Sequence, residues 1–321
     1  MGLTFGVALD FGSGRRGVAQ QLERQTGLLA SAEAAGFELV AAGESALGGS
    51  FHLPDALQVL AAICQRTRLR LCTGIALLPA WDAWKLALDA AQLDQLSGGR
   101  LVLGVGIGTP ALQMRAGWDA DAISPTVDEY LAALRALWTG GAGYAGSHLR
   151  VADGLPILPL QPNGPPIWVG GTVRRSAVRA ARYGQGWYAG INFRCSQLPR
   201  NVGWYHSALG DSGQQPEAGA VIINRLALAA ATSHEVTQLV ETYLGETLRA
   251  YGGGEPLQST IDDVGLVGTP DQIVAQLEQY RAGGVTHVFA RLSLDEMPVE
   301  VAQQTIEVFG GDIIPRLAND A

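Results

Sequence analysis

Residues 93–110 read LDQLSGGRLVLGVGIGTP and bear most directly on the fold. A helix-like segment ends at residues 97–99, and a short, almost wholly apolar run follows, which is typical of a strand buried on both faces of a parallel sheet. Glycines recur along this run at Gly104, Gly106 and Gly108. Because glycine weakens a strand, their repetition predicts that some group approaches the backbone closely near the end of the strand.

Apolar runs of this kind alternate with amphipathic segments along the whole chain. Besides the strand at Leu101, strands are predicted to start at Leu3, Phe37, Leu69, Pro166, Gly186, Val221 and Val285. Helices are predicted over Gln20–Ala35, Pro54–Gln65, Ala83–Gln95, Val127–Trp138, Arg174–Tyr183 and Pro270–Arg281. Eight strands in βα alternation, without a linker, predict an α/β protein with one domain over residues 1–321, a closed (β/α)8 TIM barrel. An open, doubly wound sheet is the alternative, which the strand count disfavours.

Two stretches interrupt the alternation. Gly140–Gln161, rich in glycine and proline, is predicted to be an insertion between the fourth and fifth strands. Ser233–Gly254 is a second insertion, between the seventh and eighth strands. Barrel enzymes build their sites at the carboxyl ends of the strands, so Gly106 and Gly108 are expected at the barrel mouth.

Composition argues against several classes of function. The chain has 321 residues, a net charge of −8 and a single lysine, Lys85, and this acidic balance without a basic cluster argues against nucleic acid. No apolar run approaches the roughly 18 residues of a membrane span, and the N-terminus lacks a signal-peptide pattern, so a soluble, cytoplasmic protein is expected. The five histidines and three cysteines show no metal-ligand spacing, so no metal site is predicted.

Residues 165–187 read PPIWVGGTVRRSAVRAARYGQGW and form a second informative stretch. A predicted strand ends at two glycines, Thr172 is placed to cap the helix that follows, and Arg174 and Arg175 add positive charge to its first turn. Free amides at a helix start bind anions such as phosphate. The local pattern alone fits either a phosphate site or an ordinary turn with a threonine cap.

Three long stretches resemble, in this order, the bacterial-luciferase-like family of flavin- and deazaflavin-dependent oxidoreductases. They are LDQLSGGRLVLGVGIG, PPIWVGGTVRRSAVRAARYGQGWYAG and GTPDQIVAQLEQYRAGGVTHV. LCTGIALLP and DEYLAALRALWTG are similar as well, so the resemblance covers most of the chain. It implies a TIM barrel that binds FMN or coenzyme F420 at its mouth, often as a homodimer.

The resemblance also implies individual cofactor-binding residues. The Gly74–Ile75 peptide matches a position where the family often has a cis, non-proline bond behind the flavin ring, and this peptide is expected to be cis or bulged. The residues so implied are Gly74 and Ile75 at the ring, Gly106 and Gly108 at the fourth strand, and Gly170, Gly171 and Thr172 at the phosphate.

The residues after the second and third strands depart from the family pattern. The family commonly has an acidic residue followed by histidine after the second strand; here Glu44 fits, but Ser45 replaces the histidine. His52 follows a few residues later. After the third strand, Trp81 and Asp82 stand where Arg-His is common, which predicts a more aromatic and less basic mouth.

A largely apolar pocket for a small organic substrate is therefore predicted at the mouth. Its polar, candidate catalytic residues are Glu44, Ser45 and Arg291, and its walls are Phe11, Trp81 and the Gly140–Gln161 insertion.

Two activities follow from the resemblance. With FMN reduced by a separate flavin reductase the protein would be a monooxygenase, and with coenzyme F420 it would transfer hydride to or from an organic substrate. The residues leave this choice open. Because Ser45 replaces the usual histidine, a non-catalytic or degenerate flavin-binding member of the family is the alternative to an enzyme.

Overall fold

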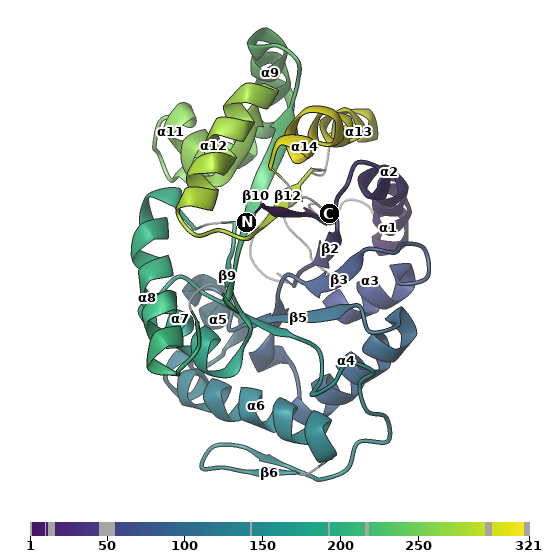
Figure 1. The fold of residues 1–321 in the computed structure, drawn as a ribbon, viewed down its shortest axis with the longest axis vertical. Coiled ribbons are helices and arrows are strands. Elements are labelled where there is room, and N and C mark those ends of the chain that lie inside the picture. The colour runs from purple at the N-terminus through teal and green to yellow at the C-terminus, as the bar shows by residue number, and fades with distance from the viewer. Residues whose placement is uncertain are drawn as a thin grey trace.

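The computed structural model of the protein describes residues 2–9, 11, 17–44, 55–141, 143–191, 193–215, 218–292 and 297–317. Its centre is a closed barrel of eight parallel strands surrounded by helices (Figure 1). The barrel strands are β1 (Thr4–Ala8), β2 (Leu39–Ala42), β3 (Arg70–Thr73), β5 (Leu101–Gly106), β8 (Ile167–Gly170), β9 (Gly186–Ala189), β10 (Ala220–Ala229) and β12 (His287–Arg291). Pairing of β9 with β10 and of β12 with β1 closes the ring. The predicted TIM barrel and its eight strands are thus confirmed.

Five of the six predicted helices are single helices, and the first one is broken. They are α3 (Ala56–Ile63), α4 (Ala83–Ser97), α6 (Ala120–Gly140), α7 (Arg174–Tyr183) and α12 (Pro270–Ala282). The segment predicted as Gln20–Ala35 is two helices, α1 (Val18–Thr26) and α2 (Leu29–Ala34), which separate at Gly27. Further helices are α5 (Pro110–Ala116), α8 (Leu198–Asp211), α9 (Ser233–Leu239), α10 (Gly245–Gly252), α11 (Leu257–Val264), α13 (Val299–Val308) and α14 (Ile314–Leu317).

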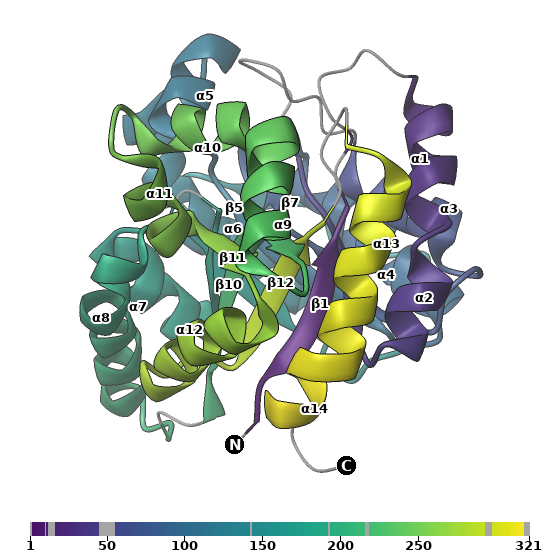
Figure 2. The same cartoon turned by 90° about the horizontal axis from the view of Figure 1, so that it is seen from above.

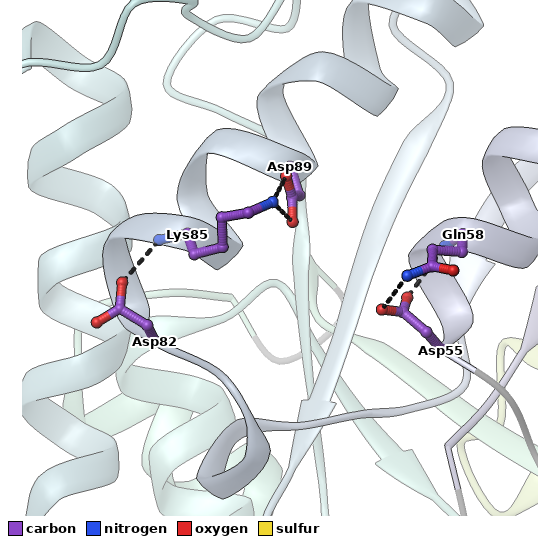
Figure 3. Close-up of polar contacts among 5 residues, drawn as sticks. All are labelled: Asp55, Gln58, Asp82, Lys85 and Asp89. Carbon is purple, nitrogen blue, oxygen red and sulfur yellow. Dashed lines mark hydrogen bonds and ion pairs between the residues drawn. The ribbon is translucent and has the colours of Figure 1, made fainter.

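Aspartates fix the starts of the two helices next to the carboxyl ends of β2 and β3. The Asp55 carboxylate accepts a hydrogen bond from the Gln58 amide at 3.0 Å and so caps α3. Asp82 caps α4 in the same way, through the Lys85 amide at 2.9 Å (Figure 3). Lys85 also forms an ion pair with Asp89 one turn along α4. Asp82, which departs from the family pattern, therefore has a structural task at this position.

Alternate residues of each strand enter two separate cores, as the two-residue period of a strand requires. One set fills the barrel interior and includes Trp168, Tyr188, Ile222 and Phe289. The other set packs against the surrounding helices in the largest apolar cluster. Seen from the side, β1 begins at the lower end of the barrel and α14 ends there, whereas α5 stands at the upper end (Figure 2). The carboxyl ends of the strands face this upper end.

The first insertion lies on the outside of the molecule. It contains an antiparallel hairpin, β6 (Tyr144–Ala145) and β7 (Arg150–Val151), which lies beyond α6 (Figure 1). The Glu129 carboxylate on α6 accepts hydrogen bonds from the backbone amides of residues 147–149. That Gly140–Gln161 walls the substrate pocket stays a prediction. The topology disfavours it, because this insertion connects a helix to the next strand, whereas barrel sites form on the connections from strand to helix.

The second insertion extends the barrel beside β10. It holds α9, α10, α11 and a short strand, β11 (Gly265–Gly268), which pairs with the last residues of β10. Leu226, Val240, Leu244, Leu248 and Val264 give it a small core of its own. Within the described ranges, no helix is long and apolar enough to cross a membrane.

Candidate active site at the barrel mouth

The group that approaches the glycines of β5 is the chain itself. A Cβ atom on Gly104 would overlap the carbonyl oxygen of Thr73, and one on Gly106 would overlap Ile75 Cδ1. The Thr73 hydroxyl donates to the Gly104 carbonyl at 2.6 Å. The glycines therefore make room for a bulge, residues 73–75, that separates β3 from the short strand β4 (Ala76–Leu77).

The Gly74–Ile75 peptide in this bulge is cis, which confirms the prediction. The bulge is held from the side of β2. The Gly74 amide donates to the Ala42 carbonyl at 2.6 Å, and the Ile75 carbonyl accepts from the Glu44 amide at 3.0 Å. A side chain on Gly43 would overlap the Gly74 carbonyl, so β2 also needs a glycine where it meets the bulge.

Glu44 joins the bulge to the starts of two helices. Its carboxylate accepts hydrogen bonds from the Leu77 amide at 2.7 Å, the Trp81 indole at 3.1 Å and the Ala56 amide at 3.3 Å. Burial raises the pKa of Glu44 above its usual value, and the three donors act in the opposite direction. The carboxylate oxygens of Glu44 are thus already occupied by hydrogen bonds from these three donors. Ser45 and His52 lie outside the described residues.

Replacing Glu44 with glutamine is expected to lower the free energy of unfolding by about 1–3 kcal/mol. The NH2 group of glutamine would face a hydrogen-bond donor at the position where a carboxylate oxygen of Glu44 accepts. Denaturant unfolding of the variant measures the loss. The matched control is Glu278→Gln, on the exposed face of α12, which is expected to leave the stability unchanged. An E44Q protein as stable as wild type would show that the hydrogen bonds of the Glu44 carboxylate do not stabilise the fold.

Three polar side chains enter the upper barrel interior opposite the bulge. Tyr188 on β9 and Asn224 on β10 are each 2% exposed, and Asn224 Nδ2 donates to the Tyr188 hydroxyl at 3.2 Å. This hydroxyl lies 2.9 Å from where a Cβ atom of Gly74 would be. Arg291 ends β12 on the inward side, two residues after Phe289. Tyr188, Asn224 and Arg291 are called the polar triad below.

The charge and protonation of the triad follow from its surroundings. Burial raises the pKa of Tyr188 above its usual value, with a further increase from Cys72, while Asn224 and the positive charge of Arg291 oppose the increase. The phenol is therefore neutral at physiological pH and keeps its proton. Within the described part of the chain, Asn224 Oδ1 is buried without a hydrogen-bond partner. A buried acceptor of this kind is suited to a ligand that carries an N–H or O–H group.

The turn after β8 presents backbone amides outward. The Gly171 carbonyl accepts from the Trp187 indole at 2.7 Å, and the Thr172 carbonyl accepts from the buried Asn201 side chain at 2.8 Å. In a planar trans peptide the N–H points away from the carbonyl, so the amides of Thr172 and Val173 point away from the Trp187 and Asn201 side chains, and both residues are exposed. Helix α7 begins directly after them without a side-chain cap.

This arrangement corrects the predicted cap and favours an anion. Val173, and not Thr172, is the N-cap residue of α7, because the helix begins at Arg174, the residue at which it was predicted to begin. Gly171 has a φ of 143°, and a Cβ atom there would lie 2.6 Å from Ser176 Cβ. A substitution at Gly171 would therefore disturb the turn itself. Arg174 and Arg175 are exposed beside the open amides.

The remaining predicted site residues within the described ranges lie in a turn or pack in the apolar core. Gly108 has a φ of 75° and lies two residues after the end of β5, next to the Leu112 side chain. Phe11 is 3% exposed within the large core cluster, and Trp81 packs partly buried against the same cluster. The described residues contain no group of three or more potential metal ligands.

Sequence reasoning missed Tyr188 and Asn224. A usable signal was present, because Asn224 is an uncharged polar residue in the middle of the apolar strand run VIINRLALAA. The even spacing of Ile222 and Asn224 places both on one face of β10, and Ile222 belongs to the barrel interior.

The chain belongs to the luciferase-like monooxygenase family, whose model matches residues 3–287. The oxygenase component of a flavin-dependent trigonelline monooxygenase from Acinetobacter baylyi is 32% identical over 121 residues, 36% of this chain and 34% of that protein. A proposed coenzyme F420-dependent oxidoreductase from Mycobacterium tuberculosis is 30% identical over 217 residues, 62% of this chain and 59% of that protein. The match thus spans about one third and three fifths of these two relatives.

Among solved structures, the monooxygenase RslO1 from Streptomyces bottropensis is similar over almost its full length. It has a TM-score of 0.83 at 25% identity, with 98% of this chain and 99% of that chain covered. The family resemblance noted in the sequence is therefore confirmed.

Proposed function

We propose that this protein is the oxygenase of a flavin-dependent monooxygenase system, which binds reduced FMN and oxidises a small, largely apolar organic substrate. The observation that carries the proposal is the turn of residues 170–173, whose outward amides lie at the start of α7 and fit a phosphate. The Gly171 amide donates to the Tyr188 carbonyl at 3.2 Å, so the turn and the polar triad share strand β9.

The residues of the chain divide the work of binding. The amides of Thr172 and Val173, with the Thr172 hydroxyl, would hold the phosphate, and Arg174 and Arg175 add positive charge. Gly74 and Ile75 would support the ring, and Asn224 Oδ1 would accept a hydrogen bond from its polar edge. When bound, the reduced flavin supplies the electrons that activate dioxygen.

Glu44 serves in this proposal as a positioning residue. Its carboxylate oxygens already accept hydrogen bonds from Leu77, Trp81 and Ala56, so they do not face open space. Arg291 and Tyr188 are the groups that face the reacting atoms, and Tyr188 supplies a neutral donor. Ser45 stays a predicted catalytic residue, Gly108 a predicted cofactor contact, and Phe11 and Trp81 stay predicted walls of the substrate pocket.

Two observations favour FMN over coenzyme F420. The relative that shares 32% identity is flavin-dependent and is an oxygenase component, which supports a separate reductase as the partner. The acidic tail of coenzyme F420 needs a continuous basic track, and the two adjacent arginines beside the turn, Arg174 and Arg175, do not make one. The similarity to the proposed F420-dependent oxidoreductase makes hydride transfer from F420 the second candidate. A homodimer is proposed from the family resemblance.

Separate titrations of the purified protein with FMN and with coenzyme F420 test the proposal. Saturable binding of FMN, and substrate-dependent consumption of oxygen when a reductase supplies reduced FMN, are expected. Binding of F420 alone would replace the proposal with hydride transfer. Binding of FMN with no turnover over a panel of apolar substrates would support the non-catalytic alternative.

In the same titration, Thr172→Val is expected to weaken FMN binding about tenfold, because a hydrogen bond to a charged phosphate is lost from an exposed side chain of unchanged shape. The melting temperature should stay that of wild type. Thr237→Val, on the exposed face of α9, is the matched control and should leave both quantities unchanged. Equal affinity of T172V and wild type would exclude the hydroxyl from the phosphate site.

A further inference from the structure

A buried asparagine on α8 contacts the turn that follows β8. Asn201 is 0% exposed and is the fourth residue of the helix. A buried amide group is costly unless its polar atoms are hydrogen-bonded. Here both atoms are used, since Nδ2 donates to the Thr172 carbonyl at 2.8 Å and Oδ1 accepts from Arg200 Nε at 3.2 Å. Because α8 packs along α7 (Figure 1), Asn201 reaches the turn at the start of the neighbouring helix.

The positive charge of Arg200 is available beside this asparagine. Its guanidinium lies 4.9 Å from the centre of the Trp204 ring, one turn further along α8, and the residue is exposed. Within the described residues, no carboxylate forms an ion pair with Arg200. Helix α7 contains no acidic residue, and α8 contains none before Asp211. The charge of Arg200 is therefore not neutralised by a carboxylate of either helix at this end.

These groups form a chain of hydrogen bonds that all run in the same direction. Arg200 donates to Asn201, and Asn201 donates to the Thr172 carbonyl. This carbonyl shares its peptide group with the N–H of Val173, which points away from Asn201. In a chain of this kind each hydrogen bond polarises the next one and strengthens it. The charge of Arg200 therefore makes the Val173 N–H a stronger donor to an anion.

The amide before Val173 is held in the same way by a neutral group. The Trp187 indole, which is 0% exposed, donates to the Gly171 carbonyl at 2.7 Å, and this carbonyl shares its peptide group with the Thr172 N–H. Side chains from β9 and α8 thus fix the two peptide groups of the turn before any ligand binds. A site that is already in its binding conformation avoids the cost of ordering it.

We infer that Asn201 and Arg200 are positioning residues of the phosphate site, which aim and strengthen the Val173 amide and so select a cofactor that carries a phosphate. The inference rests on the proposed function, in which this turn holds the phosphate of FMN. Riboflavin has the ring system of FMN without the phosphate, so the ratio of the two affinities isolates the contribution of the turn. A side chain that only stabilised the fold would leave this ratio unchanged.

Fluorescence titrations with FMN and with riboflavin measure the ratio. Wild type is expected to bind FMN about 100-fold more tightly than riboflavin, because the phosphate accepts charge-assisted hydrogen bonds from the turn. Asn201→Ala is expected to reduce this ratio about tenfold, through a loss of FMN affinity alone. The matched control is Gln161→Ala, which removes a side-chain amide that donates to the Leu101 carbonyl at the opposite end of the barrel. It is expected to leave the ratio unchanged.

Arg200→Met changes an exposed side chain, so its effect can be measured whether or not the Asn201→Ala protein folds. It is expected to reduce the ratio about threefold, and to have no further effect when added to N201A, because Arg200 acts through Asn201. A wild-type ratio near one would overturn the phosphate site of the proposed function, and this inference with it. The expected ratio in wild type with no change in either variant, or an R200M effect that persists in full in N201A, overturns the inference alone.

Discussion

Replacing Gly104 with alanine is expected to lower the free energy of unfolding by about 3 kcal/mol. The added Cβ atom would overlap the carbonyl oxygen of Thr73, a backbone atom that the pairing of β3 with β2 and the hydrogen bond from the Gly74 amide to the Ala42 carbonyl hold in place. Neither strand can move away without breaking the barrel. Denaturant unfolding measures the effect, and a loss of FMN affinity should accompany it because the bulge would shift.

The matched control for this substitution is Gly203→Ala in α8, where an added Cβ atom meets no atom within 4 Å. Alanine restricts the unfolded chain and favours a helix, so G203A is expected to raise the stability by about 0.5–1 kcal/mol. Gly106→Ala should lie between the two, because it meets the flexible end of the Ile75 side chain. Equal stability of G104A and wild type would show that the bulge yields.

The barrel could be predicted from the sequence because each of its strands is an apolar run with helix-like spacing on either side. Strand β11 was missed, since GLVG at residues 265–268 is short, contains two glycines and pairs with the end of β10 alone. The broken helix at Gly27 was missed for a related reason. Apolar spacing continues across the break, and only tertiary packing decides where the helix bends.

The site could be predicted in part. Glycines at alternate positions of β5 predicted that some group approaches the strand closely. The approaching atoms belong to Thr73 and Ile75, about 30 residues earlier in the chain, and they meet the glycines only when the barrel closes. Thr172 lies in the predicted turn but is not the N-cap of the helix that follows. Its carbonyl accepts a hydrogen bond from Asn201 on α8, a contact that local spacing does not reveal. The polar triad depends on three strands at once, and only their shared barrel brings Tyr188, Asn224 and Arg291 together.

Replacing Tyr188 with phenylalanine is expected to lower kcat about 100-fold in the proposed oxygenase reaction while FMN affinity changes little. The hydroxyl accepts from Asn224 Nδ2, so its own proton is left to donate into the space beside Gly74. Steady-state kinetics with reductase-supplied FMN measure kcat, and a fluorescence titration measures FMN affinity.

Tyr205→Phe separates this donor role from the effect of losing any buried phenol. Tyr205 is 0% exposed, and within the described residues its hydroxyl has no hydrogen-bond partner, so its removal should leave kcat unchanged. The pH profile adds a second readout. Because burial raises the pKa of Tyr188, the phenol keeps its proton as the pH rises through and above neutrality, and kcat of wild type should show no basic decline from this group. A Y188F enzyme with the kcat of wild type would assign the donor role to another residue. Arg291, on the inward side at the end of β12, would then be the first residue to mutate.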